Sequence, residues 1–195
     1  SMGDELEYLK SEISDIITKI YNNGQLPVRT SVNFYRDKGD DYVVHATPFT
    51  ADVSEVLSYI GKEYASGGGD IPEAVHTALD NAVNGHEWDP DAEKMLFFVL
   101  DAPPHSESAV YESLNASIVA AAEKGIRIVP IVSSGADGLV EYLMRSYAVL
   151  TGGTYTFLTD HSGIGNAHTT PDTTVAYEVK PLIDTLNDVI RDYLK

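Results

Sequence analysis

The chain has 195 residues, a length that suits one domain with a sizeable core. It carries 13 Lys and Arg against 30 Asp and Glu, a formal net charge of −17. A surface of this sign repels phosphate backbones and anionic lipid headgroups, so no nucleic-acid partner is expected. The absence of cysteine excludes disulfides, thiolate metal sites and a cysteine nucleophile. No apolar segment is long enough to predict membrane insertion.

The first part of the chain predicts helices and a β-hairpin. Apolar residues recur at helical spacing over residues 6–20, and NNG then supplies a stop. Two β-rich runs flank the turn-type cluster DKGDD, which is the pattern of a hairpin. A short helix is expected at about 51–64. The sequence GGGDIP introduces another helix, and Pro72 is expected in its first turn, where backbone amides lack intrahelical acceptors.

The rest of the chain alternates strands with helices. KMLFFVLDAPPH and IRIVPIVSS contain short apolar runs flanked by helical patterns, which favours buried parallel strands. Helices are expected at about 106–124 and 137–150, then a short strand at TYTFL, then a closing helix whose apolar face begins at Val175 and Val179. This order predicts one α/β domain over residues 1–195, with a three-layer, doubly wound (Rossmann-like) sheet that is mostly parallel and has one antiparallel edge strand.

Three polar segments are expected to meet at one edge of this sheet. They are residues 1–4, 67–73 and 101–105, each placed before a helix or after a strand. In open α/β sheets, ligands bind beyond the carboxyl ends of the strands, because loops and helix amino ends converge there. Oxygen-rich segments of this kind suit Mg²⁺, Mn²⁺ or Ca²⁺.

The same segments resemble the von Willebrand factor type A family. SMGDELEYLKSEI looks like the tail of that family's DxTGSM first loop, GGGDIPEAVHTAL resembles its second loop and helix, and FFVLDAPPH resembles its third metal loop. The likeness runs in element order over nearly the whole chain. It implies a metal-ion-dependent adhesion site, in which a divalent cation is completed by an acidic group of a partner protein. On that basis, the expected metal ligands are Ser1, Asp70 and Asp101.

The resemblance also implies that part of the site lies upstream of this sequence. Ser1 matches only the last hydroxyl of the family's first loop, so that loop's Asp and the central strand before it would precede Ser1, and we expect the cation in the intact domain. Asp70 takes the place of the usual Thr, which favours the cation but weakens its attraction for an acidic partner. The dipeptide SM is also what tag cleavage leaves, and GDELEYLKSEI fits the helix in either case.

A lost central strand would leave ladder groups unpaired and apolar faces uncovered. Three responses stay open: the flanking strands close up, a second molecule supplies the pairing and gives a homo-oligomer, or the fold rearranges. The truncation hypothesis predicts five strands where the family has six, and a first helix that begins near Asp4.

Loop residues are the candidate contacts to a protein ligand. His105 lies just beyond Asp101, and the polar segment 159–174 is long enough to suggest a function. The residues expected to contact the partner are His105, Asp160, His161 and His168. Simpler roles stay open: Asp70 and Asp101 also suit helix caps, and His105 also suits a solvent-facing loop.

The sequence therefore predicts a non-enzymatic protein-binding module for adhesion or assembly. One alternative is a cation-dependent hydrolase, with Asp101 as ligand or nucleophile and His105 as acid or base. That alternative requires a second set of convergent acids, or a nucleophile with an orienting base. Another is a structural module without metal. The resemblance, the acidity and the missing cysteines favour a cell-envelope or secreted location.

Overall fold

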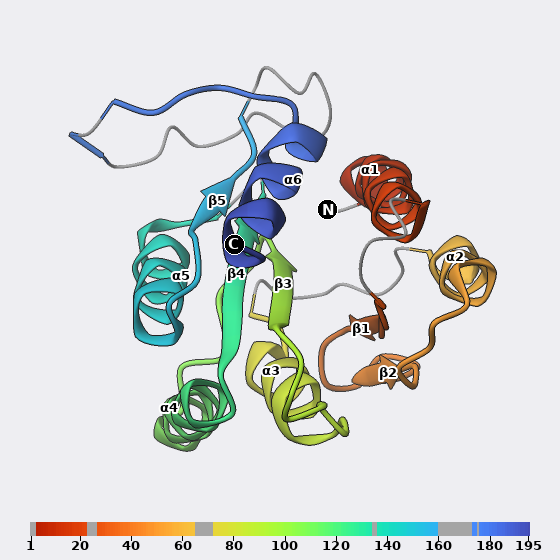
Figure 1. The fold of residues 1–195 in the computed structure, drawn as a ribbon. Coiled ribbons are helices and arrows are strands. Elements are labelled where there is room, and N and C mark those ends of the chain that lie inside the picture. Colours follow the sequence, from red (N-terminus) through yellow and green to blue (C-terminus); the bar gives the residue numbers. More distant parts are fainter. Residues whose placement is uncertain (1–2, 23–26, 65–71, 134–135, 160–172, 175) are drawn as a thin grey trace.

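The computed structural model describes residues 3–22, 27–64, 72–133, 136–159, 173–174 and 176–195 (Figure 1). In chain order its elements are α1 (Gly3–Asn22), β1 (Asn33–Tyr35), β2 (Val44–Ala46), α2 (Val53–Lys62), α3 (Val75–Asn84), β3 (Lys94–Leu100), α4 (Ser108–Glu123), β4 (Ile126–Val132), α5 (Gly138–Thr151), β5 (Thr156–Phe157) and α6 (Leu182–Tyr193). The described ranges thus contain the five strands that were expected. No helix within these ranges is long and apolar enough to cross a membrane.

Strands β3, β4 and β5 form a parallel sheet in that order, which confirms the predicted α/β class. β3 and β4 pair over their full length, from Lys94 opposite Ile126 to Leu100 opposite Val132. Their side chains alternate between two apolar clusters. Phe98 and Leu100 pack with α3, α4 and α5 on one face, and Ile131 packs with α1 and α6 on the other. Burial on both faces explains why these strands read as continuous apolar runs.

The antiparallel part is a separate two-stranded sheet. β1 pairs with β2 in a register that places Tyr35 opposite Val44, and the turn between them contains Gly39 at a φ of 98°. This positive φ fits the predicted DKGDD turn, because glycine adopts it without steric cost. Helix α2 packs behind this hairpin against α1, through Val56 and Ile60.

Two helix starts were predicted wrongly, and a proline explains the second. α3 begins at Val75, with Ala74 at its cap position, so Pro72 precedes the helix instead of lying in its first turn. α6 begins at Leu182, directly after Pro181. Proline disfavours helical backbone in the residue before it, so the apolar spacing that includes Val179 does not continue as helix. Val179 is exposed.

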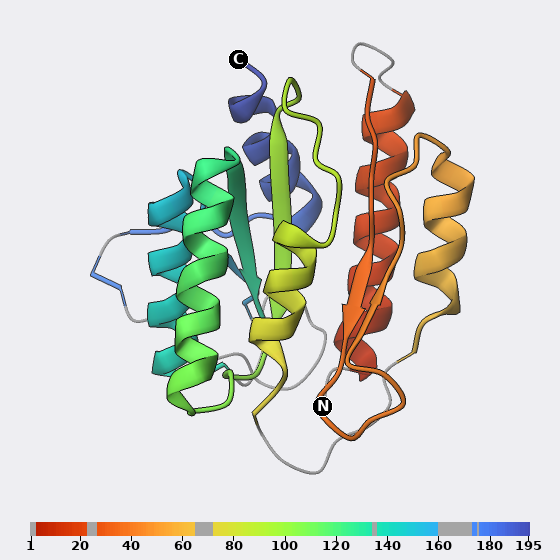
Figure 2. The ribbon, with the colours of Figure 1, turned by 90° about the horizontal axis from the view of Figure 1, so that it is seen from below.

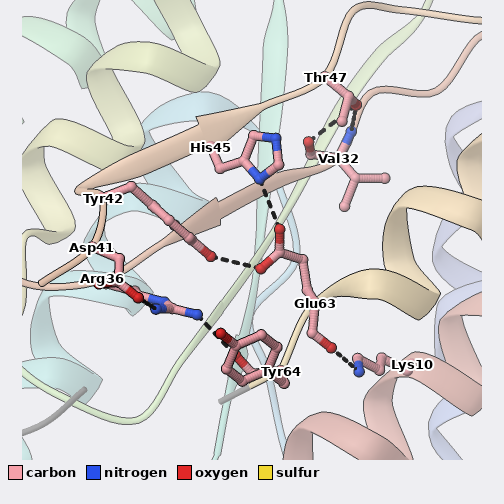
Figure 3. A network of polar contacts seen from close by, with 9 residues as sticks. All are labelled: Lys10, Val32, Arg36, Asp41, Tyr42, His45, Thr47, Glu63 and Tyr64. Carbon is pink, nitrogen blue, oxygen red and sulfur yellow. Dashed lines mark hydrogen bonds and ion pairs between the residues drawn. The ribbon is translucent and has the colours of Figure 1, made fainter. Parts of the chain in front are cut away.

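A polar network centred on Glu63 holds the hairpin to the helices beside it (Figure 3). The Glu63 carboxylate accepts a hydrogen bond from the Tyr42 hydroxyl at 2.8 Å, and its other oxygen lies 2.7 Å from Nδ1 of His45. The Glu63 backbone carbonyl accepts a hydrogen bond from Lys10 of α1. Burial, followed by the hydrogen bond and charge of Glu63, raises the pKa of Tyr42 to about 12. Glu63 therefore joins β2, α1 and the turn before β2.

We predict that Glu63→Ala lowers the free energy of unfolding by about 1–3 kcal/mol, because it removes two acceptor bonds of a largely buried carboxylate. Urea unfolding at pH 7 measures the change. Glu87→Ala, which removes an exposed acid, is the matched control and should change stability by less than about 0.5 kcal/mol. Equal effects of the two substitutions would contradict a structural role for the network.

Candidate functional site at the carboxyl ends of the parallel strands

The loop after β3 and the segment before α3 lie side by side. The Glu73 amide donates a hydrogen bond to the carbonyl of Pro103 at 3.0 Å, and Glu73 forms an isolated parallel bridge with Pro104. Asp101 follows β3 directly. Two of the three segments expected to converge therefore meet at this edge, at least through Glu73 and residues 101–104.

The carboxylates of Asp101 and Glu73 act on a common neighbour, Tyr35 at the end of β1. Tyr35 is half-buried, and its ring lies 6.3 Å from the ring of Phe98 on β3. Burial, then the charge of Asp101, then that of Glu73, raises the pKa of Tyr35 far above its ordinary value. The phenol thus stays protonated at neutral pH beside these two carboxylates.

An ion pair connects this edge to the hairpin. His105 Nε2 lies 2.7 Å from Asp37 Oδ1, and the two side chains are only 16% and 14% exposed. Burial alone would raise the pKa of Asp37. The hydrogen bond from His105, the backbone amide of Lys38 and the nearby positive charges outweigh burial and hold this pKa below its ordinary value. Asp37 is therefore ionised at neutral pH and fixes the orientation of the His105 ring.

A second histidine, His76 on α3, belongs to the same group of residues. Burial, then the charges of Lys38 and His105, lowers the pKa of His76. Its Nδ1 atom is buried and makes no hydrogen bond within the described part of the chain. His76 is therefore neutral at pH 7 and adds no positive charge to the edge.

The structure places only two of the seven predicted site residues. Asp101 and His105 lie at the expected edge, whereas Ser1, Asp70, Asp160, His161 and His168 fall outside the described residues. The helix-cap alternative for Asp101 and the solvent-facing alternative for His105 do not hold, whereas stabilisation of the turn by Asp101 stays open. Asp101 does not cap the next helix, because the cap position of α4 is Glu107. His105 is not a solvent-facing loop histidine, because Asp37 binds it.

Sequence reasoning missed Asp37, Glu73 and His76. Asp37 was interpreted only as part of a turn cluster, and His76 was not singled out. One feature of the sequence could have pointed to Asp37. It lies in a hairpin turn that directly follows a predicted strand, and such a turn can reach the same sheet edge as the loop after β3. Nothing in the sequence, however, indicates that Asp37 would meet a residue 68 positions away.

The described residues do not by themselves make a metal centre. Within them, no group of three or more His, Asp or Glu side chains is arranged to hold an ion. Asp101 and Glu73 offer carboxylate oxygens, the donors that Mg²⁺, Mn²⁺ and Ca²⁺ prefer. A complete coordination shell would need further ligands, and Ser1 and Asp70 are the candidates that the sequence supplies.

Comparison with known proteins supports the fold. The chain is similar in structure to the conserved hypothetical protein BatB from Bacteroides thetaiotaomicron, a von Willebrand factor type A domain protein, with a TM-score of 0.63. The match covers 100% of this chain and 92% of that chain at 14% sequence identity. At this identity the likeness is one of fold alone.

Sequence comparison adds little. The chain is 28% identical over 108 residues to the putative ariadne-like RING finger protein R811 of Acanthamoeba polyphaga mimivirus. That alignment covers 55% of this chain but only 10% of the viral protein. No protein-family model matches the chain.

We predict that Asp37→Asn destabilises the protein by about 1–3 kcal/mol at pH 7, because it removes a charge-assisted hydrogen bond between two largely buried groups. The pKa of Asp37 is lower in the folded protein, so its contribution is complete above the unfolded pKa and is lost as the pH falls through the folded pKa. The difference between the two proteins should therefore shrink below about pH 4. Urea unfolding at pH 7 and pH 3.5 measures it, and a difference that is the same at both pH values would contradict the assignment.

Proposed function

We propose that the chain is a non-enzymatic protein-binding module of the von Willebrand factor type A kind, and that it binds its partner at the carboxyl ends of β3 and β4. The observation that carries the proposal is the bridge between Glu73 and Pro104, which places a carboxylate from each of two separate segments at one sheet edge. Convergent acids at this edge are suited to holding a cation, and through it an acidic group of another protein.

In the intact domain, the proposed cation is Mg²⁺, Mn²⁺ or Ca²⁺. Asp101 would be one ligand, and Ser1 and Asp70 would complete the set directly or through water. The electrostatics of the edge supports this assignment, because the negative charges of Asp101 and Glu73 both act on Tyr35. A bound cation would offset the repulsion between these carboxylates. It would also reverse the sign of the local potential that an acidic partner meets.

The residues proposed to contact the partner protein surround the cation. His105 lies beside Asp101 in the chain, and Asp37 holds its ring in one orientation. Asp160, His161 and His168 stay proposed contacts on the basis of sequence. The net charge of −17 makes an acidic partner dependent on the cation, because without it the two surfaces repel each other.

One observation favours a second candidate, a cation-dependent hydrolase. The pair of Asp37 and His105 has the form of a histidine base oriented by a carboxylate. In this candidate His105 would act as acid or base, and Asp101 as metal ligand or nucleophile. Hydrolysis of p-nitrophenyl acetate or p-nitrophenyl phosphate that requires Mg²⁺ and is lost in His105→Gln would favour the hydrolase.

We predict that Mn²⁺ at micromolar to millimolar concentration broadens the NMR signals of the loop after β3, because the ion is paramagnetic and its ligands lie there. Asp101→Asn should abolish this selective broadening. Glu123→Gln is the matched control, since it removes one negative charge at the far end of α4 and should leave the effect unchanged. Broadening spread evenly over the acidic surface, or equal in the two variants, would overturn the cation site.

A further inference from the structure

The outer side of helix α5 is apolar and exposed. Four of the nine large apolar side chains that are exposed within the described residues lie on this one helix: Leu139, Tyr142, Val149 and Leu150. Tyr142 is 68% exposed and Val149 79%. Figures 1 and 2 show α5 at the outside of the molecule, on the face of the parallel sheet away from α1 and α6. Apolar side chains gathered on an exposed surface mark an interaction site.

The opposite side of α5 is apolar as well. Val140 and Met144 are buried there against the sheet. The two charged residues of the helix, Glu141 and Arg145, pair with each other at 2.9 Å, and the guanidinium of Arg145 stacks on the ring of Tyr155 at 5.0 Å. A helix that is apolar on all sides is usually buried on all sides. The outer side of α5 is therefore suited to being covered.

Other helices of the same chain differ from α5 in this respect. The exposed side of α4 contains Glu112 and Glu123, and that of α6 contains Asp184, Arg191 and Asp192. Charged surfaces of this kind are expected in a chain with a net charge of −17. The apolar side of α5 is thus a local departure from the composition of the surface.

The spacing of the exposed residues indicates what covers them. Leu139, Tyr142, Ser146 and Val149 follow one another at intervals of three, four and three residues, and we call these four residues the α5 seam. Leu150 lies directly beside the seam. Intervals of three and four residues keep a stripe of side chains directed at one neighbouring helix, as in a coiled coil. The seam therefore favours a helix as the covering element.

The centre of the α5 seam suits a helix that meets its own copy. Ser146 is small, and its hydroxyl donates a hydrogen bond to the carbonyl of Tyr142 at 2.7 Å. It therefore needs no polar partner across a contact and lets two helices approach closely. Larger side chains flank it on both sides, Tyr142 four residues before and Val149 three residues after. A twofold axis at Ser146 would place the Tyr142 of each copy beside the Val149 of the other.

Charge favours a second copy that packs in the antiparallel direction. Two copies with a net charge of −17 repel each other, so a contact between them has to exclude charged side chains, as the α5 seam does. Asp137 is exposed and caps the amino end of α5. Parallel packing would bring the two copies of Asp137 together, whereas antiparallel packing separates them and sets opposite ends of the helix dipoles side by side.

We propose that the α5 seam is the interface of a homodimer, in which the α5 helices of two copies pack antiparallel about a twofold axis near Ser146. Each copy contributes the four residues of the seam and Leu150. This contact is much smaller than the roughly 20–30 residues a side of a standard interface, so the dimer is weak and reversible. The proposal uses a different surface from the strand edges and does not depend on the cation site.

The arrangement has a consequence for the carboxyl edges of the two sheets. α5 connects the parallel strands β4 and β5, so it runs in the direction opposite to theirs. Antiparallel α5 helices thus make the strands of the two copies antiparallel. The two carboxyl edges then lie at opposite ends of the dimer, and both are left uncovered by the α5 contact.

The first test is sedimentation equilibrium of the chain from micromolar to millimolar concentration. We expect a reversible dimer whose association strengthens with salt, because screening weakens the repulsion between copies. Tyr142→Glu and Val149→Glu should each raise the dissociation constant by roughly tenfold or more. Leu194→Glu is the matched control, since it adds the same charge at an exposed apolar residue just after α6 and should leave the constant unchanged. All three positions are exposed, and an unchanged Tm verifies that the variants fold.

The second test measures the direction of packing and uses the absence of cysteine from the chain. Under mild oxidation, Ser146→Cys should give a disulfide-linked dimer, because its two copies meet at the axis. Leu139→Cys should not, because antiparallel packing places its two copies roughly 21 Å apart along the helices. Glu123→Cys, exposed at the end of α4, measures the background from random collisions.

Four results would contradict the proposal. The first is a monomer at every concentration. The second is a dimer that Tyr142→Glu and Val149→Glu leave intact, which would place the contact on another surface, such as the strand edges. The third is linkage of Leu139→Cys as fast as that of Ser146→Cys, which would make the helices parallel. The fourth is a monomer that binds neutral phosphatidylcholine vesicles and loses this binding in Tyr142→Glu, which would make a lipid surface the partner of α5.

Discussion

The ladder between β3 and β4 is the interaction on which the rest of the structure depends. Seven consecutive residue pairs set the two strands in register, and both faces of the pair are covered by helices. The ladder places the last residues of both strands at one edge, so Asp101 and Ser133 follow the strands side by side. The amide of Ser133 donates to the carbonyl of Leu100 at 2.9 Å, which continues the pairing one step into the loops. The geometry of the edge is thus set by buried backbone pairing.

Charge at this edge follows from that placement. Asp101 and Glu73 act together on Tyr35, whereas Asp37 has its own partner in His105. The His105 ring is therefore held by Asp37. The edge combines this ion pair with the negative charges of Asp101 and Glu73, which both act on the Tyr35 phenol. An ion pair of two largely buried groups defines geometry more than it adds stability, because desolvation offsets much of its attraction.

Features that leave a pattern within a few neighbouring residues could be predicted from the sequence, whereas contacts between residues far apart in the chain could not. The apolar runs of β3 and β4 predicted buried parallel strands, since two-sided burial leaves a pattern within a few residues. Asp101 and His105 could be placed at the edge because they directly follow such a strand, and ligands bind beyond the carboxyl ends of strands in α/β sheets. Local apolar spacing misplaced the start of α6, because Pro181 overrides it. The pairing of Asp37 with His105 depends on the direction in which the hairpin leaves α1, and no local pattern encodes that direction.

The hairpin and the parallel sheet meet at this edge through the ends of β1 and β3. Tyr35, the last residue of β1, packs against Phe98 of β3 and lies near Asp101. The ring contact holds the end of β1 against β3, and the pair of Asp37 and His105 joins the segments that follow these two strands. The contact that holds the hairpin to the parallel sheet thus also places the Tyr35 phenol near the carboxylates that raise its pKa, so the packing of the two sheets and the electrostatics of the edge depend on one another.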